Sequence, residues 1–170
     1  VGGGGSTRAD RGQAAQALEE LEACLARCDG EPFEVDLHGA LAAVRARLGD
    51  PARAAPQAER ALTQDATREH AAGLRIRALV ALEDPSGALE TVRALFRATP
   101  DAELPTVAAL AGELAPFDDA VVQAVDDVLA RLPDHAPSLW LRGSTRADLG
   151  QDAAALEDLE ACPPRSGETP

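Results

Sequence analysis

A stretch of twenty residues occurs twice in this chain, and it constrains the fold more than any other feature of the sequence. Residues 5–24 read GSTRADRGQAAQALEELEAC, and residues 143–162 read GSTRADLGQDAAALEDLEAC. The copies differ at only four pairs of positions, which are Arg11/Leu149, Ala14/Asp152, Gln16/Ala154 and Glu20/Asp158. The two starts lie 138 residues apart (143 minus 5), which is close to four periods of about 34 residues. A near-verbatim copy at this distance predicts a chain built from structural repeats.

The composition predicts that these repeats are helical. Hydrophobic residues make up 45% of the 170 residues, and most of them are Ala and Leu, whereas aromatic residues make up 2%. Small and unbranched apolar side chains favour closely packed helices, while strands prefer the β-branched and aromatic types that are scarce here. We therefore expect an all-α fold, which at this length is one domain or one short repeat array.

A small residue early in the second helix of each expected unit sets the repeat register. It falls at Ala17, Ala54, Ala88, Val121 and Ala155, with spacings of 37, 34, 33 and 34 residues. Each unit is expected to contain a helix A, a short turn and a helix B. The units are expected to span about residues 6–32, 33–67, 68–101, 102–135 and 136–162. Residues 1–5 are interpreted as a glycine-rich linker or disordered start, and residues 163–170 as a C-terminal tail.

Three local features depart from this regular pattern. In unit one, glycines replace the apolar residues of helix A, so we expect a short helix over about 6–11, a turn at Gly12 and a helix B over about 13–27. In unit four, helix A is expected over about 102–115, where a proline ends it. Pro56 lies inside helix B of unit two, and we expect it to kink that helix or to distort its first turn.

The last unit shows the repeat pattern most clearly, in Leu139-Trp140-Leu141-Arg142-Gly143, Leu149-Gly150, Ala155 and Leu159. This pattern resembles the tetratricopeptide repeat, a helix-turn-helix unit with small residues between its helices, a turn glycine and a proline at the unit end. Gly12, Gly49 and Gly150 fall at the turn position, where the other two units have Glu83 and Pro116. The resemblance implies an α-solenoid, a right-handed superhelix of about four and a half units whose A helices line a concave face.

The concave positions of that family imply a set of partner-binding residues on the A helices. Carried over position by position, the candidates are Arg47, His70, Arg77, Thr106, Glu113, Trp140, Ser144 and Asp148. Trp140 is the only Trp of the chain, and we expect it to anchor a partner in the groove, with packing in the core as the alternative. Arg47 and Arg77 come from adjacent units and are candidates for holding an acidic group. The alternative to a peptide groove is a solvated inner face that binds nothing.

The sequence predicts neither an enzyme nor a metal or cofactor site. Cys24 and Cys28 are four residues apart on one helical face, which suits half a metal site, a redox pair or two small buried side chains. We favour the buried interpretation, since a free Cys behaves as a small hydrophobic residue. His38, His70 and His135 lie on three separate elements, without a nucleophile and an acid at a recognisable spacing. We therefore expect no catalytic residue and no bound cofactor.

The net charge narrows the classes of partner. Asp and Glu number 29 against 16 basic residues, all of them Arg, and the net charge is −13. This balance argues against binding to nucleic acid or to an anionic membrane surface. The sequence lacks an apolar run of the length that spans a membrane. Three cysteines fit a reducing cytoplasm better than a disulfide framework. The absence of Lys and Asn is typical of a GC-rich bacterial genome.

Two functions are consistent with these features. The first is a non-enzymatic scaffold whose groove binds a peptide or a protein, and the second is a self-association module that forms a homodimer through the open ends of the array. Charge is also segregated, because residues 45–77 hold seven Arg against four acids, and residues 101–134 hold eight acids against Arg131 alone. We interpret this segregation as mixed solvated helix faces rather than as two docking surfaces.

Overall fold

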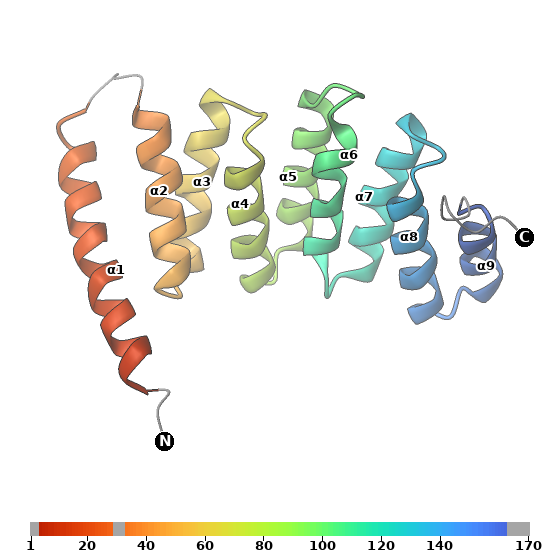
Figure 1. The fold of residues 1–170 in the computed structure, drawn as a ribbon, viewed down its shortest axis with the longest axis horizontal. Coiled ribbons are helices and arrows are strands. Elements are labelled where there is room, and N and C mark those ends of the chain that lie inside the picture. Colours follow the sequence, from red (N-terminus) through yellow and green to blue (C-terminus); the bar gives the residue numbers. More distant parts are fainter. Residues whose placement is uncertain (1–3, 29–32, 163–170) are drawn as a thin grey trace, which may run out of the picture. The chain divides into compact units, whose positions relative to one another are not determined.

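The computed structural model describes residues 4–28 and 33–162, with side chains from residue 10 onward, and these residues form helices and no strand (Figure 1). The elements are α1 (Gly4–Leu25), α2 (Glu34–Arg47), α3 (Pro51–Gln64), α4 (Glu69–Ala81), α5 (Pro85–Ala98), α6 (Leu104–Val107), the 3-10 helix η1 (Ala108–Leu114), α7 (Asp118–Arg131), α8 (Ala136–Asp148) and α9 (Asp152–Glu160). The chain divides into two compact units, the first ending at Asp84 and the second beginning at Pro85. The predicted all-α fold is confirmed.

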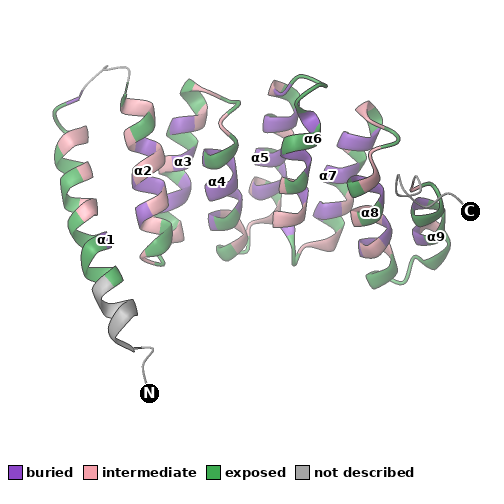
Figure 2. Cartoon of the chain, viewed as in Figure 1, coloured by how far each residue is buried: buried purple, intermediate pink, exposed green. Residues whose placement is uncertain are grey.

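In the first unit, the helices pack in chain order. α1 packs against α2, α2 against α3 and α3 against α4, and α2 also contacts α4. Small side chains permit this close packing: Ala42, Ala58 and Leu74 bring α2, α3 and α4 together in one buried cluster. α3 continues through Pro56, whose ring stands on an exposed part of the helix, so the proline does not divide helix B of unit two. Burial in this unit is therefore concentrated on α2, α3 and α4 (Figure 2).

In the second unit, α7 occupies the middle of the packing. It contacts α5, η1 and α8, while α8 contacts η1 and α9. The fully buried side chains Leu95, Leu104, Leu114, Val125 and Val128 come from α5, α6, η1 and α7. These Leu and Val side chains are larger than the alanines that dominate the core of the first unit. They form the core against which α8 packs.

Three helix ends share one backbone motif, and they provide the most direct structural evidence of repetition. Gly49, Glu83 and Gly150 adopt positive φ angles of 74°, 57° and 73°. At each, the following amide donates to the carbonyl five residues earlier, as from Asp84 to Leu79 at 2.9 Å, and the positive-φ residue itself donates three residues back. This is the Schellman arrangement that ends α2, α4 and α8. Glu83 thus occupies the predicted turn-glycine position and adopts the same left-handed conformation.

The predicted turn at Gly12 is wrong. Residues 4–25 form one uninterrupted helix, so the expected helices over 6–11 and 13–27 are a single element. Residues 4 and 5 of the predicted linker belong to this helix, while residues 1–3 and the predicted tail at 163–170 lie outside the described residues. Gly12 is exposed and does not need a positive φ, because it lies inside a regular helix.

The predicted helix A of unit four is only partly α-helical. Leu104–Val107 is one turn of α-helix, and Ala108–Leu114 continues as a 3-10 helix. Pro116 excludes Ala115 from the helical region (φ −58°, ψ 133°), so the segment ends after eleven residues counted from Leu104 to Leu114. The tighter 3-10 hydrogen bonds satisfy the backbone of this segment up to the proline.

Candidate interaction surfaces

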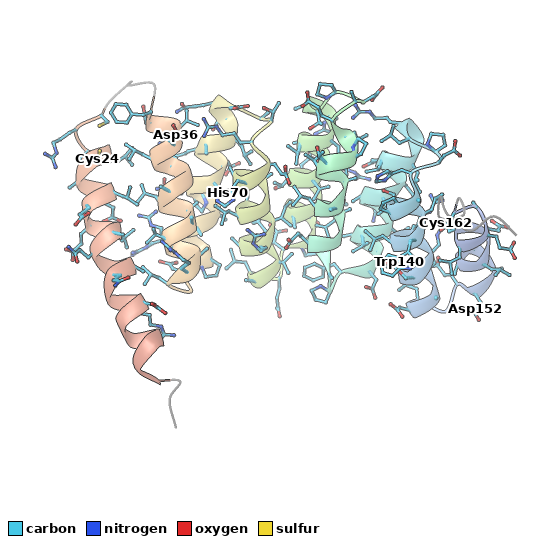
Figure 3. The ribbon with its side chains drawn as sticks, viewed as in Figure 1. Cys24, Asp36, His70, Trp140, Asp152 and Cys162 are labelled. Carbon is cyan, nitrogen blue, oxygen red and sulfur yellow. The ribbon has the colours of Figure 1, made fainter. Side chains whose placement is uncertain are left out.

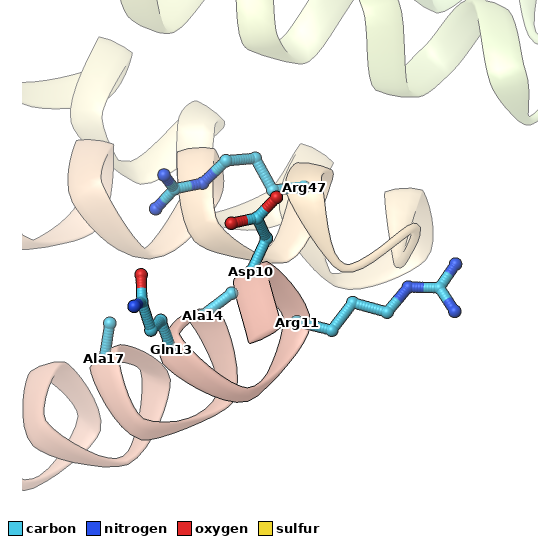
Figure 4. A pocket seen from close by; sticks show the side chains of 6 residues that line it. All are labelled: Asp10, Arg11, Gln13, Ala14, Ala17 and Arg47. Carbon is cyan, nitrogen blue, oxygen red and sulfur yellow. The ribbon is translucent and has the colours of Figure 1, made fainter. Parts of the chain in front are cut away.

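Arg47, the last residue of α2, lines an open cleft between α2 and α1. The cleft has a volume of about 570 Å³ and is lined by Asp10, Arg11, Gln13, Ala14, Ala17 and Arg47 (Figure 4). Arg47 is exposed, as the sequence predicts for a binding residue. The sequence did not predict that α1 would form the opposite wall, because it placed residues 6–11 in a separate helix.

The other two candidates of the first unit lie on α4, which packs beside α2 and α3. His70 (Figure 3) and Arg77 are both exposed. The N-terminal end of α4 is held to α2 by an ion pair in which Arg68 Nη1 lies 2.5 Å from Asp36 Oδ1. Hydrogen bonding to Asp36 raises the pKa of the Arg68 guanidinium.

Much of the basic charge between residues 45 and 77 is paired inside the first unit. Arg45 lies 2.7 Å from Glu22, and Arg75 lies 2.9 Å from Glu59. Arg53 and Arg68 also have carboxylate partners within the unit. This pairing agrees with the interpretation of mixed helix faces, because Arg45, Arg68 and Arg75 connect helices of the unit and Arg53 pairs with the N-cap Asp50 of its own helix.

The candidates of the second unit lie on α6, η1 and α8. Thr106 is exposed, and its hydroxyl donates to Glu103 O at 2.5 Å, while half-buried Ser144 donates to Leu141 O at 3.0 Å. Glu113 is half-buried on η1, a helix that packs beside α8. Asp148 is exposed at the end of α8. Both hydroxyl groups therefore donate hydrogen bonds to nearby backbone carbonyls. The neighbouring side chains are thus more available to contact a partner.

Trp140 is 61% exposed on α8, and the alternative that it packs in the core is wrong (Figure 3). The residue before it, Leu139, is 5% exposed and fills the core position of this turn instead. Since successive residues of a helix point about 100° apart, burial of Leu139 directs Trp140 away from that contact. A large aromatic surface is thus held on a rigid helix and remains in contact with solvent.

A buried ion-pair cluster joins α8 to α9, and sequence reasoning missed it. The Asp158 side chain is 5% exposed and accepts from Arg142 Nη2 at 2.6 Å, from Arg142 Nε at 2.9 Å and from Arg146 Nη1 at 2.8 Å. Arg142 also reaches Asp126 of α7 at 2.6 Å. Hydrogen bonding to Asp158 raises the pKa of the Arg142 guanidinium. The cluster therefore joins α7, α8 and α9. In the sequence, the feature that could have pointed to it is the change from Glu20 to Asp158 between the copies.

The outward side of α9 is a second feature that the sequence did not single out. Leu156 is 56% exposed and Leu159 is 42% exposed, whereas Ala155 and Asp158 of the same helix are buried against α8. The two leucines are three residues apart; Leu156 is the more exposed, while Leu159 lies at the edge of this side, where its Cγ and Cδ2 also approach Gly143 of α8. An apolar stripe of this kind is normally covered by another helix.

The described cysteine and histidine side chains do not assemble a metal site. Cys24 Sγ and Cys28 Sγ are 3.7 Å apart as free thiols, with Cys24 half-buried and Cys28 buried. His38 is buried, and its Nδ1 lies 2.7 Å from Gln57 Oε1. Within residues 10–28 and 33–162, there is no group of three His, Cys, Asp or Glu side chains that could hold an ion. Among the described helices, none is both long enough and apolar enough to cross a membrane.

Comparison with known structures identifies the fold. A crystal structure of MamA matches with a TM-score of 0.56 at 13% sequence identity, over 95% of this chain and 92% of that one. A MamA RS-1 double mutant matches with a TM-score of 0.51 at 16% identity, over 93% of each chain. A tetratricopeptide repeat protein from Parabacteroides merdae matches with a TM-score of 0.50 at 16% identity, over 92% of this chain and 76% of that one. The predicted class is confirmed: the chain has a tetratricopeptide-repeat-like α-solenoid fold.

These matches are made by structure and not by sequence. No protein-family model matches the sequence, and no curated protein matches it in sequence comparison. At 13–16% identity, the likeness defines the arrangement of helices and leaves the choice of partner to the surface residues of this chain.

Proposed function

We propose that the chain is a non-enzymatic scaffold that binds a peptide or protein segment on the exposed faces of its A helices. The observation that carries this proposal is Trp140, whose indole is 61% exposed on a helix that is otherwise fixed by buried contacts. Trp is among the residues most often found as binding anchors.

The rigidity of α8 supports the proposal. Arg142, two residues after Trp140, is tied to both α7 and α9, and Leu139 before it is buried. A side chain on such a helix loses little conformational entropy when it is covered by a partner. Ser144 and Asp148 follow Trp140 at intervals of four residues, which places them along the same side of α8. Together they form an aromatic anchor followed by a hydroxyl and a carboxylate.

The first unit contributes a face of different character to this proposal. Arg47, His70 and Arg77 are exposed on α2 and α4. Two guanidinium groups and an imidazole favour an acidic segment, whereas the α8 face favours an apolar or aromatic one. Each unit is therefore proposed to bind its own kind of segment, the first unit an acidic one and α8 an apolar or aromatic one.

Capture from a bacterial lysate followed by a titration tests this function. Proteins retained by the intact chain would be compared with those retained by Trp140→Ala and by the control Gln123→Ala, an exposed change on α7. A true partner is lost with Trp140→Ala and kept with the control. In the titration with the purified partner, loss of the anchor weakens binding by about tenfold or more, because such residues contribute about 2 kcal/mol.

Intrinsic fluorescence supplies a direct readout in the same titration. The chain has one Trp and no Tyr, so its indole emission reports on Trp140 alone. Covering the indole with an apolar side chain shifts its emission to shorter wavelength. Unchanged emission on binding, together with an affinity that survives Trp140→Ala, would show that α8 is not the binding face.

A further inference from the structure

The face of α9 that carries Leu156 and Leu159 has a counterpart inside the first unit, because the two stretches are copies. Leu156 corresponds to Leu18 and Leu159 to Leu21. Leu18 and Leu21 are half-buried on α1, the helix against which α2 packs. The same side chains on α9 are 56% and 42% exposed. The first copy of this surface thus lies on a helix packed against α2, whereas the second is more open.

The helix that covers the first copy shows what chemistry the surface accepts. α2 reads EVDLHGALAAVRAR, in which Leu37, Leu41 and Val44 recur at helical spacing. Beside this stripe, Arg45 Nη2 lies 2.7 Å from Glu22 Oε1 of α1, with only 13% of the Arg45 side chain exposed. An apolar stripe flanked by one arginine therefore matches two leucines followed by a glutamate.

The second copy keeps that glutamate as well. Glu160 occupies the position of Glu22, four residues after Leu156 and one residue after Leu159, and it is exposed. A second acidic side chain, Glu157, is also exposed on α9. The open surface consequently offers Leu156, the exposed part of Leu159 and the Glu160 carboxylate at the positions that Leu18, Leu21 and Glu22 occupy on α1.

We propose that the Leu156, Leu159 and Glu160 face of α9 docks an amphipathic helix of a partner protein, a helix with an α2-like leucine stripe and one arginine placed to pair with Glu160. The partner is a different polypeptide rather than α2 of a second copy. In each folded chain α2 is already covered by α1, which is tethered to it and therefore competes at a high effective concentration. This surface lies on α9 and is additional to the α8 face to which we assign groove binding.

A peptide of residues 33–50 of this chain is a suitable probe, because it contains α2 with its leucine stripe and Arg45. The labelled peptide would be titrated with the full chain and with Leu156→Glu, Leu159→Glu and the matched control Ala161→Glu, an exposed change on the other side of the same helix turn. We expect saturable binding to the parent chain and to Ala161→Glu, and at least tenfold weaker binding to each leucine variant.

A charge exchange tests the ionic half of the proposal without altering the leucines. The Arg45→Glu peptide is expected to bind the parent chain several-fold more weakly, and to recover its affinity against the Glu160→Arg chain. Because Glu160 is exposed, its replacement leaves the fold intact even where a leucine variant does not, and circular dichroism confirms the helix content in every case.

The possible results of these titrations distinguish docking on α9 from displacement of the internal α2. Equal affinity for the parent chain and both leucine variants would mean that the peptide displaces the internal α2 from α1, and it would overturn the proposal. Failure of the peptide to bind the parent chain at millimolar concentration would overturn it as well. Trp140→Ala is expected to leave peptide affinity unchanged, so a failure of groove binding on α8 and a failure of this docking site are distinguishable.

Discussion

The two copies of the twenty-residue stretch fold differently. Residues 5–24 lie within one continuous helix, α1, whereas residues 143–162 form the end of α8, a tight turn at Gly150 and all of α9. Only four positions separate the sequences. A near-identical local sequence therefore supports either a straight helix or a hairpin, and the choice is made by what surrounds it.

The ion-pair cluster is the largest difference between the two surroundings. In the second copy, Arg142 and Arg146 clamp α8 to α9 through buried Asp158. In the first copy, Gly4 stands at the position of Arg142, and Glu20 at that of Asp158 is exposed and accepts a hydrogen bond from Gln16. The first copy therefore lacks the Arg–Asp pair that joins the two helices of the second.

The turn itself is also less favoured in the first copy. Asp152 stands in the first turn of α9, where a carboxylate is favourable beside the unpaired amides, and Ala14 replaces it in the first copy. Ala is the strongest helix former, so this change favours continuation of the helix. Leu149 is 36% exposed and helps to line a cleft with Leu89 and Phe117, whereas its counterpart Arg11 is a charged, exposed side chain. Each substitution therefore shifts the balance towards the straight helix.

The largest expected effect comes from removing the clamp. Asp158→Ala leaves Arg146 without this carboxylate and leaves Arg142 with Asp126 only, so we expect a loss of about 2–4 kcal/mol in the free energy of unfolding. Urea denaturation followed by circular dichroism measures it. The matched change in the first copy, Glu20→Ala, is expected to alter stability by less than about 0.5 kcal/mol. Equal losses for the two variants would contradict the assigned difference between the copies.

The next effect concerns the contact between the two helices of the hairpin. A Cβ added at Gly143 would lie 2.9 Å from Leu159 Cγ and 3.2 Å from Ala155 O. Gly143→Ala is therefore expected to separate α8 from α9 and to cost about 1–3 kcal/mol. The thermal unfolding midpoint of the second unit reports this loss. A neutral or stabilising result would mean that α8 and α9 do not approach each other as closely as described.

The smallest expected effects on stability have opposite signs in the two copies. Gly12 lies within α1 with nothing within 4 Å of an added Cβ, so Gly12→Ala is expected to stabilise the helix by about 0.5–1 kcal/mol. Gly150 has equally open space but a φ of 73°, so Gly150→Ala is expected to destabilise by about 1–2 kcal/mol. Both are measured by urea denaturation. If Gly12→Ala also destabilises, the first copy contains the turn that its sequence suggested.

Much of the fold could be predicted because the repeat anchors are local signals. Ala54, Ala88, Val121 and Ala155 are all buried, as their spacing predicted, although Ala17 of the first copy is only half-buried. The turn positions of Gly49, Glu83 and Gly150 were also placed correctly. These features depend on residues within a few positions of one another, which a single sequence displays directly.

The features that escaped prediction depend on partners distant in the chain. The turn at Gly12 was predicted from its alignment with Gly150. In the hairpin at Gly150, however, the two helices are also joined by the ion pair between Arg142 and Asp158. The exposure of Leu156 follows from the lack of a helix covering α9 among the described residues, and no property of the leucine itself reveals it. The candidate site residues Arg47, His70 and Arg77 are exposed as expected, and their use in binding remains a proposal.

A distance measurement in each copy tests the central claim most directly. Spin labels would be placed at Ser6 and Ala23 in one chain, and at Ser144 and Ala161 in another, with the native cysteines replaced. A straight helix rises about 1.5 Å per residue, so the first pair is expected about 26 Å apart. Adjacent helices of a hairpin lie about 8–10 Å apart, so the second pair is expected at roughly 10–15 Å. A first-pair distance that matches the second would contradict the account, because both copies would then be hairpins.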